Sequence, residues 1–94
     1  MALGVLFLEI HLPGCSSLKE KRGRLKPLLA RLHKKFNVSV AEMDRLDAWG
    51  ESVIACALIS NDRAHTERSL QEVARWIEEN WFDVTVVGEQ YDLF

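Results

Sequence analysis

The residues of this chain that are best suited to chemistry are basic side chains gathered in one stretch. Residues 17–36, SLKEKRGRLKPLLARLHKKF, hold eight of the twelve Lys and Arg but a single acid, Glu20, which gives the stretch a net charge of +7. Ammonium and guanidinium groups contact phosphates by charge and hydrogen bonding, or pair with carboxylates of the same protein. The candidate nucleic-acid-binding residues are therefore Lys19, Lys21, Arg22, Arg24, Lys26, Arg31, Lys34 and Lys35.

The first turns of this stretch allow two explanations. Lys19, Lys21 and Arg22 stand near the start of an expected helix, where each positive charge opposes the helix dipole by about 0.3–1 kcal/mol. One explanation is an acid within the fold, and Arg22, which flanks the apolar face, could reach Glu9, Glu42 or Asp47. The other is a bound anion, because helix N-terminal amides with Lys and Arg make a phosphate site. The sequence leaves both explanations open.

No group of residues predicts catalysis. The histidines, His11, His33 and His65, are dispersed and none has a Cys, Asp or Glu at metal-ligand spacing. Cys15 precedes a helix N-terminus, where a thiolate is favoured, but no base accompanies it. We therefore expect neither an enzyme nor a metal or cofactor.

Composition predicts one globular domain over residues 1–94. The chain is 48% apolar and 28% charged with a net charge of −2, and residues 37–94 carry four basic residues against twelve acids. Two cysteines are too few for a disulfide framework. The first residues resemble a lipoprotein signal, but no Lys or Arg precedes Lys19 and Glu9 interrupts the apolar run. We expect a cytoplasmic protein with no membrane segment.

The elements that must position these residues follow from periodicity. Strands are expected at 2–11, 36–43, 52–60 and 83–91, and polar residues 44–52 form a hairpin loop. Ser17 and Glu20 form a capping box that starts the first helix, and Ser60, Asn61 or Asp62 caps the second. This order is β-α-β-β-α-β. It predicts an α+β, ferredoxin-like fold with a four-stranded antiparallel sheet and two helices on one face.

Both faces of that sheet are apolar at its centre. The first expected strand places Leu6, Leu8 and Ile10 on one side and Val5 and Phe7 on the other. A sheet covered on one side alternates apolar with polar residues, so something must cover the second face. We expect a second copy of the chain, as a homodimer. The alternative is that the C-terminal tail, with Tyr91, Leu93 and Phe94, folds back over this face.

The hairpin loop is a second candidate surface. Trp49 stands in a polar segment with Asp47, and aromatic side chains are favoured binding anchors. We take Asp47 and Trp49 as candidate partner-binding residues. Packing of Trp49 onto a neighbouring helix or subunit is an equally good explanation.

Several of these segments resemble a known family. SLKEKR at 17–22, KFNVSVAE at 35–42, Asp47 with Trp49, and ACALIS at 55–60 are similar to the YlxP-like family of small bacterial proteins. The resemblance implies a ferredoxin-like fold and, because the family is of unknown function, no mechanism. Some members are encoded among translation and ribosome-maturation genes, which implies an RNA or ribosome context. A buried charge network between the helix start and the second strand would account for several of the shared charged residues.

Two functions remain. The first is a non-catalytic accessory protein that binds RNA or a ribonucleoprotein through the basic first helix. An RRM-type surface is excluded, because the third strand, 52–60, carries no aromatic residue for base stacking. The second is a protein–protein or small-ligand regulatory module that acts through the second sheet face or the Trp49 hairpin.

Overall fold

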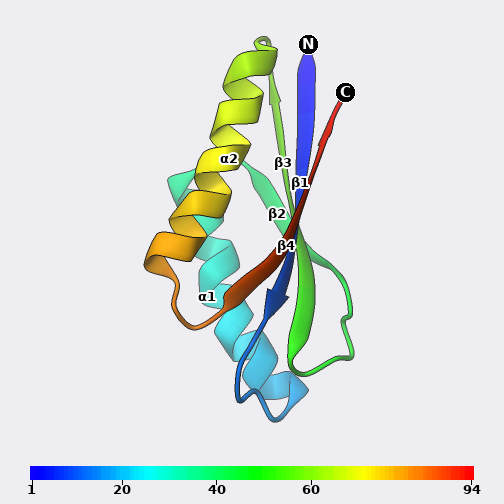
Figure 1. Ribbon diagram of the computed structural model, residues 1–94, viewed down its shortest axis with the longest axis vertical. Helices are drawn as coiled ribbons and strands as arrows, with labels where there is room; N and C mark the ends of the chain where they lie inside the picture. The colour runs from blue at the N-terminus through cyan, green and yellow to red at the C-terminus, as the bar shows by residue number, and fades with distance from the viewer.

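The computed structural model describes residues 1–94 and contains six elements (Figure 1). In chain order they are β1 (Ala2–His11), α1 (Leu18–Lys35), β2 (Ser39–Asp44), β3 (Glu51–Ser60), α2 (Arg63–Asn80) and β4 (Thr85–Leu93). The strands form one antiparallel sheet in the order β2-β3-β1-β4. The predicted ferredoxin-like α+β fold is confirmed.

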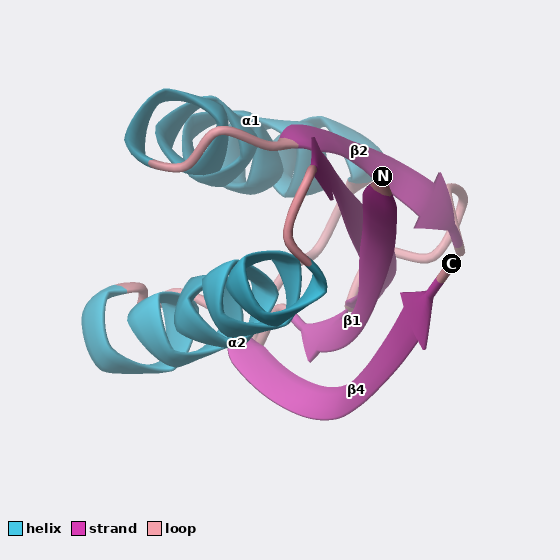
Figure 2. Ribbon diagram, turned by 90° about the horizontal axis from the view of Figure 1, so that it is seen from above, coloured by secondary structure: helices cyan, strands magenta, loops and turns pink.

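Both helices lie on the same side of the sheet, as Figure 2 shows, and the core fills the space between the two layers. Alternate residues of the central strands point toward the helices, which is why every second residue of β1 is buried. Each helix turns one apolar stripe toward this sheet face. The fully buried side chains of the core include Leu6, Leu8, Ile10, Leu28, Leu32, Ile54, Leu70, Val73 and Ile77.

Each helix begins at the cap that the sequence predicts. The Ser17 hydroxyl accepts a hydrogen bond from the Glu20 amide at 3.0 Å, and the Glu20 carboxylate accepts one from the Ser16 amide at 3.1 Å. Asp62 caps α2 by accepting from the amides of Ala64 and His65. These bonds satisfy helix N–H groups that have no partner within the helix. Helix α1 runs through Pro27 without a break.

The close contact between α2 and β1 depends on Gly4. A Cβ atom at this position would lie 2.7 Å from Leu70 Cδ1 and 2.8 Å from Thr66 Cγ2. Contacts this short do not occur between carbon atoms in folded proteins, so any larger residue would displace the Leu70 and Thr66 side chains that pack α2 against the sheet. Gly4 therefore sets the distance between these two elements.

The observed strands differ from the expected ones at their ends. β2 begins at Ser39 rather than residue 36, because Phe36 caps α1 and half-buries its ring against the core. β4 extends to Leu93, and Phe94 exchanges backbone hydrogen bonds with Leu3. The C-terminal residues thus continue the sheet edge, and the prediction that they fold back over the second sheet face is wrong. Neither helix is long and apolar enough to cross a membrane.

Candidate functional site

Lys21 is the basic residue of α1 that the structure places in the interior. It lies on the helix side that carries Leu25 and Leu28, and only 1% of its surface is exposed. Its Nζ is 2.8 Å from Glu42 Oε2 on β2 and donates to the Arg45 carbonyl at 2.7 Å. The helix α1, the strand β2 and the loop after β2 therefore meet at one ammonium group.

The Glu42 carboxylate is held from a second side. The Ser52 hydroxyl donates to Glu42 Oε2 at 2.7 Å, and Ser52 is itself fully buried. Arg45 adopts a φ of 58°, an uncommon conformation for a residue with a side chain, and its carbonyl is the remaining acceptor at Lys21. The arrangement is a hydrogen-bonded ion pair with no free charge, which we call the Lys21–Glu42 network.

This network decides between the two explanations for the first turns of α1, one residue at a time. Lys21 forms an ion pair with an acid of the same chain and is not available to a ligand. It is therefore removed from the candidate nucleic-acid-binding residues. The expectation that Arg22 reaches an acid is wrong. Glu42 pairs with Lys21, Glu9 pairs with Arg45, and Arg22 points to solvent without an ion pair.

Arg24 is also occupied within the fold. Its Nε lies 3.0 Å from Asp83 Oδ2, and its Nη1 donates to the Pro13 carbonyl at 2.8 Å. A further hydrogen bond joins Nη2 to the Asp83 carbonyl, and Nη1 also lies 3.8 Å from Glu20 Oε2, four residues earlier in the helix. Arg24 therefore ties α1 to the loops on both sides of it.

The other six basic residues of α1 are exposed, and none of them makes an ion pair. Spacings of three and four residues put Lys19, Arg22 and Lys26 on one stripe of the helix, turned away from the core. Lys35 Nζ also lies about 6 Å from the rings of Phe36 and Trp76. We call this set the α1 basic surface: Lys19, Arg22, Lys26, Arg31, Lys34 and Lys35.

Helix α2 offers a useful contrast. Its exposed cations, Arg63, Arg68 and Arg75, are interspersed with acids at 67, 72, 78 and 79. Mixed charges of this kind are typical of a solvated helix face. The excess of positive charge is therefore confined to α1.

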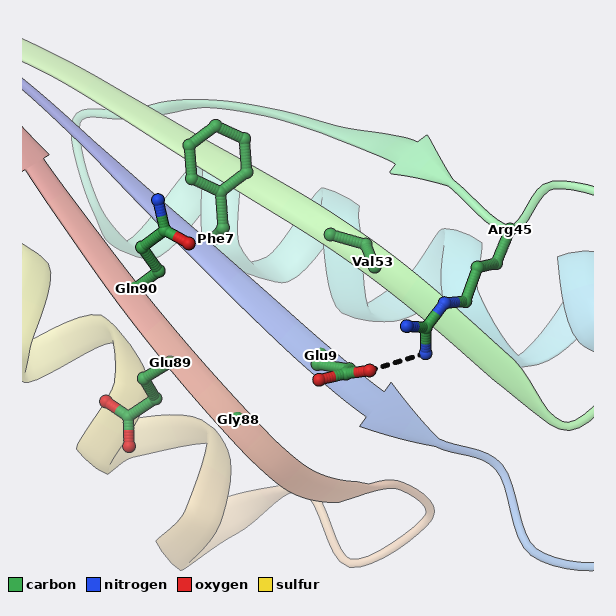
Figure 3. Close-up of a pocket in the computed structure, with 7 residues that line it drawn as sticks. All are labelled: Phe7, Glu9, Arg45, Val53, Gly88, Glu89 and Gln90. Atoms are coloured by element: carbon green, nitrogen blue, oxygen red, sulfur yellow. Dashed lines mark ion pairs between the residues drawn. The ribbon is translucent and has the colours of Figure 1, made fainter.

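The sheet face opposite the helices carries a shallow polar hollow of about 320 Å³ (Figure 3). Arg45 pairs there with Glu9 at 2.5 Å and with Glu51 at 3.4 Å. Arg45 could not be found from the sequence, because its contact with Glu9 depends on how β2 and β1 are placed around β3. The hollow is lined by Phe7, Glu9, Arg45, Val53, Gly88, Glu89 and Gln90.

The hairpin loop between β2 and β3 presents the two predicted partner-binding residues to solvent. Trp49 is 54% exposed and Asp47 is exposed, and neither side chain makes a hydrogen bond or ion pair. The loop itself is anchored, because the Leu12 amide donates to the Gly50 carbonyl at 2.9 Å. An aromatic ring is thus held out on a fixed loop.

The thiols and histidines stay apart. Cys56 is buried in the core, and burial raises the pKa of its thiol to about 12. Cys15 Sγ contacts the Ser17 carbonyl, and His33 Nδ1 lies 2.9 Å from the Val38 carbonyl. No three His, Cys, Asp or Glu side chains lie close enough to share a metal ion.

Comparison with known proteins supplies the family. Residues 3–90 match the family described as "Protein of unknown function (DUF503)". The chain belongs to this family. It is also 38% identical over 76 residues to "Uncharacterized protein YlxP" of Bacillus subtilis (strain 168), and the match covers 81% of this chain and 83% of that protein. The expected YlxP-like membership is confirmed, and the DUF503 match runs from β1 into β4.

Proposed function

We propose that this DUF503-family protein is a non-catalytic accessory protein of the cytoplasm that binds RNA or a ribonucleoprotein such as the ribosome. The α1 basic surface is the contact. The protein acts by touching phosphates rather than by reading bases. The observation that carries the proposal is the set of six exposed cations on one helix that no acid of the same chain neutralises.

The cations of the α1 basic surface are suited to phosphate as their ligand. A cation that neutralises a phosphate releases a condensed counterion. For each tenfold rise in salt concentration, the binding constant therefore falls by almost tenfold per contact. Six contacts are enough to lose about 10³-fold in affinity between 50 and 200 mM salt. The absence of Phe, Tyr and Trp from α1 and from β3 favours contact with the backbone of folded RNA over stacking on unpaired bases.

The test is anisotropy of a labelled stem-loop RNA with the purified protein at about 50 and 200 mM salt. The variant removes one stripe of the α1 basic surface, Lys19→Ala with Arg22→Ala and Lys26→Ala. The matched control removes the same charge from α2, as Arg63→Ala with Arg68→Ala and Arg75→Ala. All six residues are exposed and without ion pairs, so both variants keep the fold intact.

We expect the α1 variant to bind more weakly and to flatten the salt slope by about three units, one for each lost contact. The α2 control should lower affinity by a smaller amount, through net charge alone. No binding at the lower salt concentration, or equal losses in both variants, would contradict the proposal.

A protein–protein or small-ligand regulatory module is the second candidate. The exposed Trp49 beside Asp47 favours it, because a large aromatic ring on an anchored loop is a common binding anchor. A Trp49→Ala variant that no longer replaces the parent protein in cells, although it binds RNA with the parent's affinity, would support this candidate over the first.

A further inference from the structure

The sheet face turned away from the helices is apolar over its centre, and no segment of the chain covers it. We call it the open face. It consists of paired positions on the two central strands: Leu3 with Ile59, Val5 with Ala57, Phe7 with Ala55, and Glu9 with Val53. On β2 it continues through Ala41, opposite Ala55, and Met43. Ile59 is 62% exposed and Met43 is 58% exposed.

The open face carries both a hollow and side chains that can fill one. The hollow measures about 280 Å³, and its lining is almost entirely apolar: Val5, Phe7, Ser39, Val40, Ala41, Met43, Ala55 and Ala57. Its floor is made by alanines, whose short side chains leave room for one large apolar residue from outside. Ile59 stands out farther along the same face. A surface that carries both a hollow and a protruding apolar side chain can fit a copy of itself related by a twofold axis.

The charges at one end of the open face are also self-complementary. Arg45 lies between the carboxylates of Glu9 and Glu51, so cation and anion are side by side at the surface. Facing a second copy, Arg45 of one chain can share the Glu9 of the other without leaving a buried charge unpaired. An unrelated partner would have to supply both signs at this spacing.

The area of the open face is sufficient for a stable contact. The whole of this sheet face, to which β4 adds Gly88, Gln90 and Asp92 beside the apolar centre, covers on the order of 600 Å² on each copy, at about 4.8 Å between strands and about 3.3 Å rise per residue. Specific interfaces bury at least that much per partner, about 600 to 1,000 Å². The C-terminal residues are committed to pairing with β1, so they cannot provide the cover.

We propose that two copies of this chain pack through their open faces into a twofold dimer. The dimer has four layers, helices outside and two sheets within. Because α1 lies on the helix side of each sheet, the two α1 basic surfaces end on opposite outer sides of the dimer. If RNA binds there, which rests on the proposed function, the dimer is a bivalent binder that joins two RNA segments instead of gripping one.

Sedimentation equilibrium without RNA tests the dimer, over about 1 to 100 μM chain. We expect a mass of twice the 10.8 kDa chain, and an Ile59→Glu with Met43→Glu variant at the single-chain mass. These side chains are exposed in the single chain, so the variant folds, and circular dichroism verifies it. The matched control is Phe82→Glu, because Phe82 is 85% exposed but lies outside the open face, and it stays dimeric.

A charge pair gives an independent check. Glu9→Arg alone should weaken the dimer because it sets like charges together, and Glu9→Arg with Arg45→Glu should restore it. A single-chain mass for the parent protein, or a dimer that survives both open-face glutamates, would overturn the proposal. Equal dissociation by Phe82→Glu would overturn it too, because the open face would then not be specific.

RNA of two lengths separates this inference from the proposed function. The open-face variant should bind a single stem-loop as the parent does, but should lose about 10²-fold or more of the parent's affinity for an RNA with two stem-loops. Equal affinity for the longer RNA would refute bivalency and leave RNA binding standing. If no RNA binds at all, the sedimentation result still decides the dimer.

Discussion

Lys21 and Arg22 are neighbours in the chain, carry the same charge and occupy the same helical turn, yet they lie in opposite environments. Lys21 is 1% exposed and bonded to Glu42, whereas Arg22 is exposed and has no acidic partner. Successive residues of a helix point about 100° apart, which is enough to carry one side chain into the core and leave the next in water. Basic residues in one sequence motif can therefore have unrelated roles.

The same division runs along the whole helix. On its inner side the cations hold α1 to β2 and to the loop before β4, through Lys21 and Arg24. On its outer side the cations hold nothing within the chain. Substitutions on the inner side should change stability and leave phosphate contacts alone, and substitutions on the outer side should do the reverse.

The largest expected effect is on the inner side, from Lys21→Met. Methionine keeps the apolar stem but leaves the Glu42 carboxylate, 17% exposed, without its cation. Breaking one partner of a buried pair costs about 3–5 kcal/mol, so we expect the free energy of unfolding to fall by about 3 kcal/mol in urea titrations. The control is Arg22→Met, which should change it by less than about 0.5 kcal/mol. Similar losses of unfolding free energy in both variants would show that the buried Lys21 and the exposed Arg22 do not differ in their structural role.

The next largest loss of stability is expected from Arg24→Ala. The Arg24 side chain is 17% exposed, and its guanidinium bonds to Asp83 and to the Pro13 carbonyl. Losing hydrogen bonds to a charged group should lower the free energy of unfolding by about 1–2 kcal/mol, reduced from the full value because Asp83 is half-exposed. Arg31→Ala, on the outer side, is the matched control. A thermal melt in which the two variants coincide would argue against a structural role for Arg24.

A smaller effect per unit of pH is expected from the buried Cys56 thiol of β3 at alkaline pH. Burial raises the pKa of Cys56 to about 12 in the folded protein, from 9.0 in an exposed thiol. The stability linked to this group is complete below pH 9.0 and is lost as the pH rises toward about 12, because only the unfolded chain ionises in that window. For one group the slope cannot exceed about 1.4 kcal/mol per pH unit. Cys56→Ala should be less stable at neutral pH and should show a flatter decline above pH 9.0. Parallel declines in the two proteins would be the contrary result.

The smallest effect belongs to Lys19 on the outer side. A positive charge in the first turn opposes the helix dipole by about 0.3–1 kcal/mol, so Lys19→Ala should leave the free energy of unfolding unchanged or raise it slightly. The same substitution should flatten the salt slope of RNA binding by about one unit. A clear loss of stability would move Lys19 to the structural group, and Lys34→Ala, at the favourable end of the dipole, serves as its comparison.

Much of the fold could be predicted because local signals agree with the global arrangement. Ser17 and Asp62 start the helices where side-chain oxygens can satisfy free amides, and the short, nearly continuous apolar run of β1 marks a strand that is apolar on both faces. The burial of Lys21 was not predicted, although its spacing carries a signal. Lys21 stands four residues before Leu25 and seven before Leu28, which puts it on the apolar side of the helix.

The acid that meets Lys21 could not be chosen from the sequence. Glu9, Glu42 and Asp47 were all within reach of the helix start, and the choice depends on the register between β2 and β3. That register contains an irregularity between Glu42 and Asp44. One residue of slip would turn Glu42 to the open face. Long-range placement of this kind is set by packing, which no local pattern encodes.

The position of β1 has a consequence for how the chain is made. β1 is the first strand to be synthesised but lies in the middle of the sheet, between β3 and β4. Until residues 85–93 have emerged from the ribosome, one edge of β1 has no partner, and its unpaired N–H and C=O groups are open to pairing with other nascent chains. Completion of the sheet must therefore wait for the last strand, which makes any delay in translating β4 a period of exposure to aggregation.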